Sequence, residues 1–118
     1  MSEELTRPKG VWDHRDEVQI VDVREPYEWD AGRIEGAVHV PLNDLMAGAG
    51  AFDKDKPVVF QCRLGRRSAM ATEAFLASGY DAYNMAGGIQ AWVDGGLPIE
   101  PEDGQVADHS VGPDRAHP

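Results

Sequence analysis

The sequence has little of what defines several common classes of protein. It contains a single cysteine, Cys62, so no disulfide can form within the chain, which favours a reducing compartment such as the cytoplasm. No segment approaches the roughly 18 consecutive apolar residues that a membrane-spanning helix needs. The first residues are acidic and no apolar segment follows them, unlike a secretory signal peptide. We therefore expect a soluble, cytoplasmic protein.

Basic residues are also scarce. The 118 residues include 11 lysines and arginines against 21 aspartates and glutamates, which gives a formal net charge of -10 at pH 7. A chain this acidic repels polyanions, so neither nucleic acids nor anionic membranes are expected partners. The four histidines are scattered without the spacing of a metal site, and we expect neither a metal nor another cofactor.

The length and composition suit one globular domain, which we place at residues 17–100. Residues 1–16 contain proline, glycine and few bulky apolar side chains, so we expect a mostly irregular segment that packs Trp12 onto the domain. Residues 101–118 are poor in apolar side chains and are expected to form a disordered tail. Nothing indicates an obligate dimer, so a monomer is expected.

Apolar segments of strand length alternate with short helical patterns along the domain. Strands are predicted at residues 18–23, 37–40, 57–61 and 82–85. Short helices are predicted at residues 26–30, 42–46 and 90–93, and a longer helix begins at Ser68 and is closed by Gly79. This alternation predicts an α/β fold with a central, mostly parallel sheet and helices on both faces. Ligand sites in such sheets lie at the carboxyl ends of the strands.

Cys62 lies at such a place, between the third predicted strand and the longer helix. The loop Cys62-Arg63-Leu64-Gly65-Arg66-Arg67-Ser68 leads into that helix, and such a loop directs backbone N–H groups inward to form an anion-binding nest. Three of the eleven basic residues lie here, where they oppose the helix dipole unless an anion binds. An inert core cysteine is the alternative, but the loop favours the nucleophilic thiolate.

Four segments, in this order, resemble the rhodanese-like sulfurtransferases. They are Asp22-Val23-Arg24-Glu25 with Glu28-Trp29, Gly32 to Pro41, the Cys62 to Ser68 loop, and Gly87 to Trp92. The resemblance implies a three-layer rhodanese-like fold. It also implies that Cys62 attacks the outer sulfur of a sulfane donor such as thiosulfate, becomes a persulfide, and passes the sulfur to cyanide, a thiol or a protein acceptor.

The resemblance further implies that the backbone N–H groups of the loop cradle the persulfide and the anionic donor. These groups belong to Arg63, Leu64, Gly65, Arg66 and Arg67. Arg67 is expected to pack inward or to hold anions, while Arg63 and Arg66 are expected to point to solvent and attract the donor. Four residues separate Cys62 from Arg67, as in the sulfurtransferases. Related phosphatases have one more, so phosphatase activity is not expected.

Asp22, Arg24 and Ser68 are expected to support the site structurally, the first two as a buried pair, because buried charges need partners. Arg33 stands where the family usually has histidine, and His39 is expected to be structural. Two other functions remain open. The protein could carry persulfide from one protein to another, or it could be a redox sensor in which Cys62 is oxidised. The carrier and the enzyme need the same persulfide, so the sequence does not separate these two.

Overall fold

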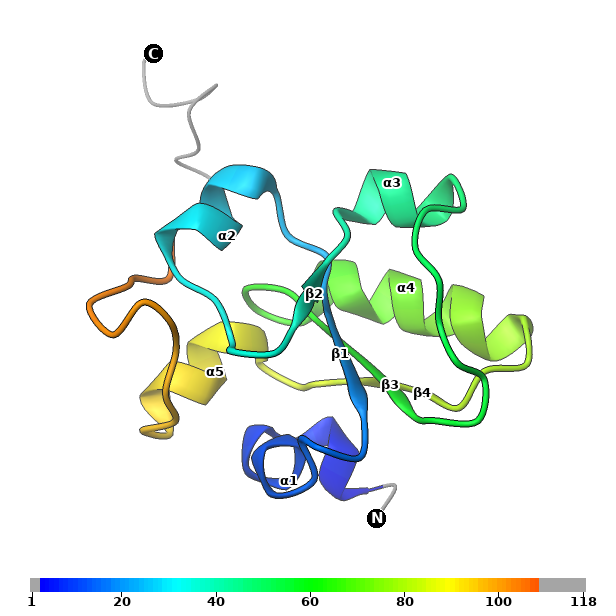
Figure 1. Ribbon diagram of the computed structural model, residues 1–118, viewed down its shortest axis with the longest axis horizontal. Helices are drawn as coiled ribbons and strands as arrows, with labels where there is room; N and C mark the ends of the chain where they lie inside the picture. Colours follow the sequence, from blue (N-terminus) through cyan, green and yellow to red (C-terminus); the bar gives the residue numbers. More distant parts are fainter. Residues whose placement is uncertain (1–2, 109–118) are drawn as a thin grey trace.

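Four strands, each close to its predicted position, form one parallel sheet (Figure 1). A computed structural model describes residues 3–108. The strands are β1 (Gln19–Asp22), β2 (Val38–His39), β3 (Val58–Gln61) and β4 (Ala82–Asn84), in the spatial order β2-β1-β3-β4. The two central strands pair with Ile20 opposite Val59 and Asp22 opposite Gln61. All four residues of β3 are buried, because helices cover both faces of the sheet.

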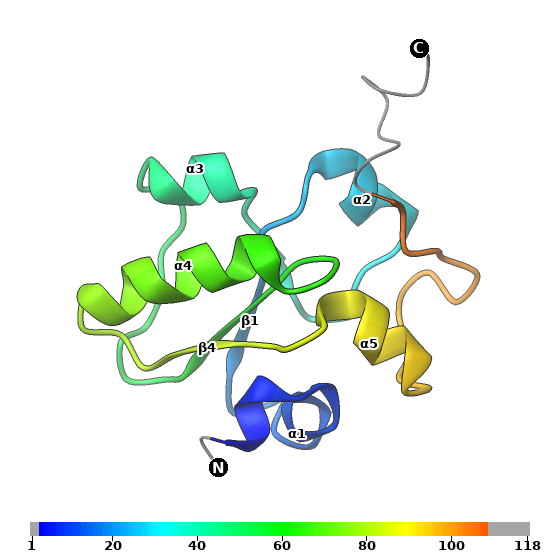
Figure 2. The same ribbon diagram turned by 180° about the vertical axis from the view of Figure 1, so that it is seen from behind.

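The helices form two layers, one on each face of the sheet (Figure 2). They are α1 (Pro8–Asp13), α2 (Pro26–Ala31), α3 (Leu42–Met46), α4 (Arg66–Ala77) and α5 (Gly88–Asp94), preceded by a 3-10 turn, η1 (Glu4–Thr6). Strand residues alternate between the layers: Val21 and Phe60 pack into the core under α3 and α4, and Ile20 and Val59 into the core under α1 and α5. The predicted three-layer α/β fold is thereby confirmed. Within residues 3–108, no helix is long and apolar enough to cross a membrane.

The helices α4 and α5 each begin two residues earlier than predicted. Each follows a glycine in the left-handed conformation, Gly65 with φ 99° and Gly87 with φ 75°. Helical periodicity is read from apolar residues, and α4 begins with Arg66 and Arg67 while α5 begins with Gly88. The loops before both helices are therefore shorter than the sequence indicated.

We had expected a mostly irregular amino-terminal segment, but the segment contains η1 and α1. Pro8 occupies the first turn of α1, where its fixed φ and missing N–H are favourable. Leu5 and Val11 are fully buried against the sheet, and Trp12 packs edge-on against Trp92 with the ring centroids 5.9 Å apart. A few well-placed apolar side chains therefore suffice to order the segment.

The first part of the expected tail also has a defined path. Residues 101–108, the carboxyl-terminal strap, contain no helix or strand, but the backbone N–H of Gln105 donates to the carbonyl of Ala31 at 2.8 Å. Val106 packs against the core under α5. The strap thus crosses the end of α2, whereas the expectation for residues 109–118 lies outside the described residues.

Candidate active site

The loop between β3 and α4 closes around the sulfur of Cys62. Cys62 follows the last residue of β3 and is 1% exposed. The backbone N–H of Gly65 donates to Cys62 Sγ at 3.1 Å. The left-handed conformation of Gly65 turns the backbone at this point, so that its N–H points at the sulfur.

The start of α5 holds the backbone of the same loop (Figure 2). The backbone N–H groups of Ile89 and Gln90 donate to the carbonyls of Cys62 and Arg63 at 2.8 and 3.1 Å. A Cβ on Gly88 would lie 2.1 Å from the carbonyl oxygen of Cys62, so only glycine permits this approach. Gly88, the first residue of α5, therefore lies directly against the backbone of Cys62.

Arg67 closes the loop through an ion pair with α2. Its Nη1 and Nη2 donate to the two carboxylate oxygens of Glu28 at 2.7 and 3.0 Å, and Glu28 is fully buried. Burial acts to lower the pKa of Arg67, but the hydrogen bond and charge of Glu28 outweigh it and raise that pKa. Glu28 is therefore the main partner of Arg67, and a negative charge on Cys62 acts on this pKa in the same direction.

Glu28 is the residue of this pair that the sequence did not single out for a role. Burial acts to raise its pKa, but the hydrogen bonds from Arg67 and from the backbone N–H of Glu25 outweigh burial and lower it. The Glu25 N–H lies 3.0 Å from Glu28 Oε1 in a capping box that starts α2. Glu28 therefore ties the start of α2 to the loop.

Asp22 and Arg24 form a second ion pair at the end of β1. Arg24 Nη2 donates to Asp22 Oδ2 at 2.7 Å, and both side chains are fully buried. The same Nη2 donates to the carbonyl of Gly32 at 2.8 Å. The pair thus connects the end of β1 to the chain that follows α2. None of these hydrogen bonds involves the loop.

Ser68 and Asn84 complete the surroundings of the sulfur. Ser68 is fully buried, and its Oγ lies 3.4 Å from Cys62 Sγ and 2.5 Å from Asn84 Oδ1. The Nδ2 of Asn84 donates to the carbonyl of Gly65 at 2.9 Å. The sequence analysis missed Asn84, although its position at the carboxyl end of β4 is a signal that could have identified it.

The three remaining loop side chains differ in exposure. Leu64 and Arg66 are exposed, as expected for Arg66. Arg63 does not point freely to solvent, contrary to expectation: its side chain is 26% exposed, and its Nη1 lies 3.8 Å from Asp108 Oδ1. The Nε of Arg63 is buried without a hydrogen-bond partner among the described residues. The strap covers Arg63, and this contact between distant segments is not visible in the sequence.

Arg33 and His39 both pack around Trp29 of α2. The His39 ring stacks on Trp29 with the centroids 4.8 Å apart, and its Nε2 lies 2.8 Å from the carbonyl of Arg24. Arg33 Nη1 donates to the carbonyl of Trp29 at 3.1 Å, and its Nε lies 3.6 Å from Glu100. These contacts give both residues structural roles.

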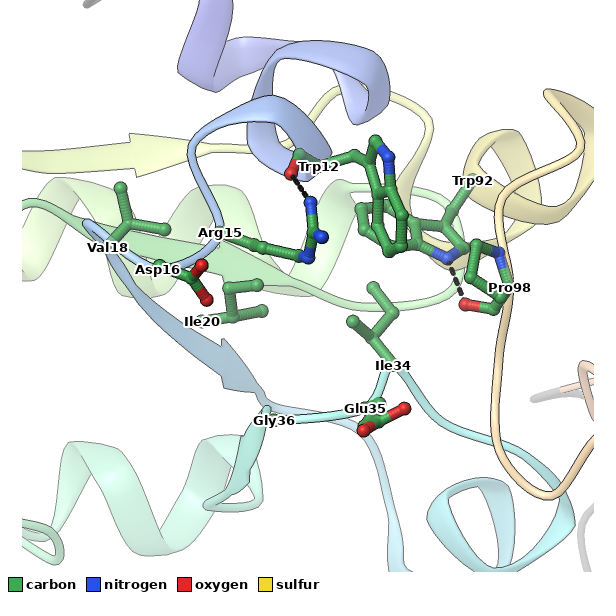
Figure 3. A pocket seen from close by; sticks show the side chains of 10 residues that line it. All are labelled: Trp12, Arg15, Asp16, Val18, Ile20, Ile34, Glu35, Gly36, Trp92 and Pro98. Carbon is green, nitrogen blue, oxygen red and sulfur yellow. Dashed lines mark hydrogen bonds between the residues drawn. The ribbon is translucent and has the colours of Figure 1, made fainter.

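A cavity of about 340 Å³ lies on the α1 and α5 face of the sheet (Figure 3). Trp12 and Trp92 form its aromatic wall, and the guanidinium of Arg15 lies 3.8 Å from the centroid of a Trp12 ring. No residue of the Cys62 to Ser68 loop lines it. Among the residues that the structure covers, no group of three His, Cys, Asp or Glu could hold a metal ion.

The family profile of the rhodanese-like domain matches residues 8–94. The chain belongs to the rhodanese-like family. A protein named sulfurtransferase from Allochromatium vinosum is 37% identical over 90 residues, which cover 75% of this chain and 84% of that protein. The thiosulfate sulfurtransferase GlpE of Pseudomonas paraeruginosa is 33% identical over 75 residues, 63% of this chain and 68% of its own.

Solved structures give the same family. The crystal structure of a rhodanese-related protein from Thermoplasma volcanium aligns with a TM-score of 0.75 and 29% identity, covering 79% of the present chain and 93% of that protein's chain. The family and its sulfurtransferase relatives support sulfur transfer as the general activity of this chain.

Proposed function

We propose that this rhodanese is a thiosulfate-type sulfurtransferase that carries a sulfane sulfur on Cys62 as a persulfide. The observation that carries the proposal is the position of Cys62 Sγ, 3.1 Å from the Gly65 N–H at the base of the loop. The relative named thiosulfate sulfurtransferase gives thiosulfate as the first donor to test. The unpaired thiol suits a reducing compartment, and we place the protein in the cytoplasm.

In the first step, the Cys62 thiolate attacks the outer sulfur of thiosulfate. A bond forms between Sγ and that sulfur, and the S–S bond of thiosulfate breaks with its electron pair leaving on sulfite. The new outer sulfur carries the negative charge. The backbone N–H of Gly65, which the loop already directs at Cys62 Sγ, can stabilise this charge with little reorganisation.

In the second step, a nucleophilic acceptor attacks the outer sulfur. With cyanide, a C–S bond forms, the persulfide S–S bond breaks, and its electron pair returns to Cys62 Sγ as a thiolate, with thiocyanate released. The two half-reactions share the enzyme but not a ternary complex, so ping-pong kinetics are expected. A thiol or a protein acceptor would enter at the same step.

The charge distribution favours an anionic donor at this loop. The chain carries a net charge of -10, yet Arg63, Arg66 and Arg67 lie within five consecutive residues beside Cys62. Arg67 is neutralised by Glu28, and Arg63 is only partly covered by Asp108. Arg66 is exposed, so it adds to a local positive potential that attracts a dianion.

The test is the intact mass of the protein after incubation with thiosulfate and again after addition of cyanide. We expect the wild-type chain to gain the mass of one sulfur atom and then to lose it as thiocyanate. Cys62→Ser is the matched control: it removes the only thiol with little change in volume, and we expect no gain in mass while thermal unfolding shows a folded chain.

Other outcomes would point to the alternatives. A sulfur that is gained but not released to cyanide would favour a protein-to-protein persulfide carrier. No gain from thiosulfate or from another sulfane donor, together with formation of a sulfenic acid by peroxide, would favour a redox sensor and contradict the proposal.

A further inference from the structure

The bonds around Asn84 fix which way its side-chain amide points. Asn84 Nδ2 lies 2.9 Å from the carbonyl oxygen of Gly65, which can only accept a hydrogen bond. The NH2 group must therefore face Gly65, and the amide oxygen Oδ1 must face Ser68. The orientation follows from the partner on the loop.

The oriented amide then determines the direction of the Ser68 hydroxyl. Ser68 Oγ lies 2.5 Å from Asn84 Oδ1, and an amide oxygen is an acceptor only. A hydroxyl has one hydrogen, so this contact requires it to point at Asn84. Ser68 Oγ also lies 3.4 Å from Cys62 Sγ, and toward the sulfur it then presents lone pairs.

We propose that Asn84 is a positioning residue that competes with the Cys62 thiolate for the single hydrogen of Ser68. When the sulfur is protonated, or is bonded to a second sulfur, it needs no donor and the hydroxyl stays on Asn84. When the sulfur is a thiolate, the hydroxyl rotates to donate to Sγ and gives up its bond to Asn84. This inference deepens the proposed function, because it assigns the hydroxyl to the two sulfur states that the proposed reaction alternates between.

The competition has a measurable consequence. A thiolate that must draw the hydroxyl away from Asn84 is less stabilised than one to which the hydroxyl is freely available. Removal of the Asn84 acceptor should therefore favour the thiolate and increase the reactivity of Cys62 at mildly acid pH. Because a hydrogen bond to a charged group is among the stronger ones, we expect an increase of about threefold to tenfold.

Other charged and titratable groups around the loop must be held constant for this comparison. They are Arg63, Arg66 and Arg67 from the loop and α4, Tyr27 and Glu28 from α2, Asp22 and Arg24 from the end of β1, and Asp108 from the strap. None of them is changed in the variants Asn84→Ala and Ser68→Ala, so differences between these chains report on the Ser68 hydroxyl or on the bond from Asn84 to the Gly65 carbonyl.

The experiment measures the rate of alkylation of Cys62 by iodoacetamide as a function of pH, without any sulfur donor. Four full-length chains are compared: wild type, Asn84→Ala, Ser68→Ala and the double variant. We expect Asn84→Ala to move the acid limb of the profile to lower pH only when Ser68 is present. An equal displacement in the Ser68→Ala background would overturn the proposal, because it would mean that Asn84 acts through its bond to the Gly65 carbonyl.

Asn84→Asp gives a second test should Asn84→Ala fail to fold. A carboxylate accepts the hydrogen of the Ser68 hydroxyl more strongly than an amide does. When Ser68 is present, Asn84→Asp should therefore displace the acid limb of the alkylation profile to higher pH. The same substitution in the Ser68→Ala background isolates the effect of the added charge. An equal displacement of the acid limb in the two backgrounds would contradict the proposal.

Alkylation does not depend on sulfur transfer, so the two proposals can fail separately. A chain that takes up no sulfur but shows the expected dependence on Ser68 would support the role of Asn84 and contradict the proposed reaction. A chain that transfers sulfur but shows no such dependence would support the proposed reaction and contradict the role of Asn84.

Discussion

The Asp22–Arg24 and Glu28–Arg67 ion pairs both contain a fully buried carboxylate, yet they join very different parts of the chain. Asp22 and Arg24 are two residues apart at the end of β1, and both side chains are fully buried. Glu28 and Arg67 are 39 residues apart, and the Arg67 side chain is 20% exposed. The first pair is local in sequence and shielded from solvent. The second joins distant segments, and its arginine is partly exposed to solvent.

This difference separates two kinds of support. The local pair braces the junction between β1 and the chain after α2. The long-range pair sets the position of α2 relative to the loop, so it acts on the geometry around Cys62. Loss of the first should therefore affect the stability of the fold, and loss of the second should mainly affect the reaction.

The largest expected effect is on stability, from Arg24→Met. The substitution leaves the Asp22 carboxylate buried without its partner, and we expect a loss of about 3–5 kcal/mol in the free energy of unfolding, measured by urea denaturation. The control is the double variant Asp22→Leu with Arg24→Met, which removes both charges and should be more stable than the single variant. Equal stability of the two would mean that the pair itself does not govern the effect.

Glu28→Gln should reduce sulfur uptake by about tenfold to a hundredfold, because a small displacement of the loop is costly for catalysis. Its effect on the unfolding free energy should be smaller than that of Arg24→Met, since Arg67 reaches solvent. Arg67→Lys is the companion variant: it keeps the positive charge but loses the two-point contact. Wild-type uptake rates in both variants, measured by mass after brief exposure to thiosulfate, would contradict the role assigned to the long-range pair.

The pH dependence of stability should reveal the same pair. The pKa of Glu28 is lowered from its ordinary value of 4.5, mainly because the hydrogen bonds from Arg67 and the Glu25 N–H outweigh its burial. A carboxyl whose folded pKa is lowered contributes stability above its unfolded pKa, and this stability is lost as the pH falls through the folded value. Denaturation midpoints measured from neutral to acid pH should therefore decline more steeply for wild type than for Glu28→Gln. Parallel curves would argue against this assignment.

The smallest expected effect comes from the strap. Asp108→Asn removes the negative charge nearest to Arg63, and we expect uptake of the dianionic donor to rise by about twofold at low salt, with the gain fading as salt screens the charges. Glu102→Gln makes the same change of charge at an exposed strap residue and is the control. An equal gain in both variants would assign the effect to net charge rather than to the contact with Arg63.

The sequence predicted the sheet and the position of the Cys62 loop for identifiable reasons. Runs of β-branched residues mark the strands, and the carboxyl end of a buried strand marks the place of Cys62. These signals are local, so they survive without a structure. The resemblance to the family added the reaction, because the residue order in the loop is distinctive.

What the sequence did not predict depends on contacts between distant segments. The helical amino terminus depends on burial of Leu5 and Val11 against the sheet. A helix of six residues is too short to show a recognisable apolar periodicity. The partners of Arg63, Arg67 and Ser68 lie 45, 39 and 16 residues away, on the strap, α2 and β4. The residues of the loop can be identified from the sequence, but their partners are determined by tertiary packing.

The attachment of the loop to α5 restricts how this protein can diverge. The carbonyls of Cys62 and Arg63 are both bound by the start of α5, and Gly88 leaves no space between them. A lineage that enlarged the loop to admit a bulkier oxyanion could insert a residue only after Arg63, between Leu64 and Arg67. Evolutionary change in the size of the loop is therefore confined to one short stretch of backbone, while Cys62 stays fixed in place.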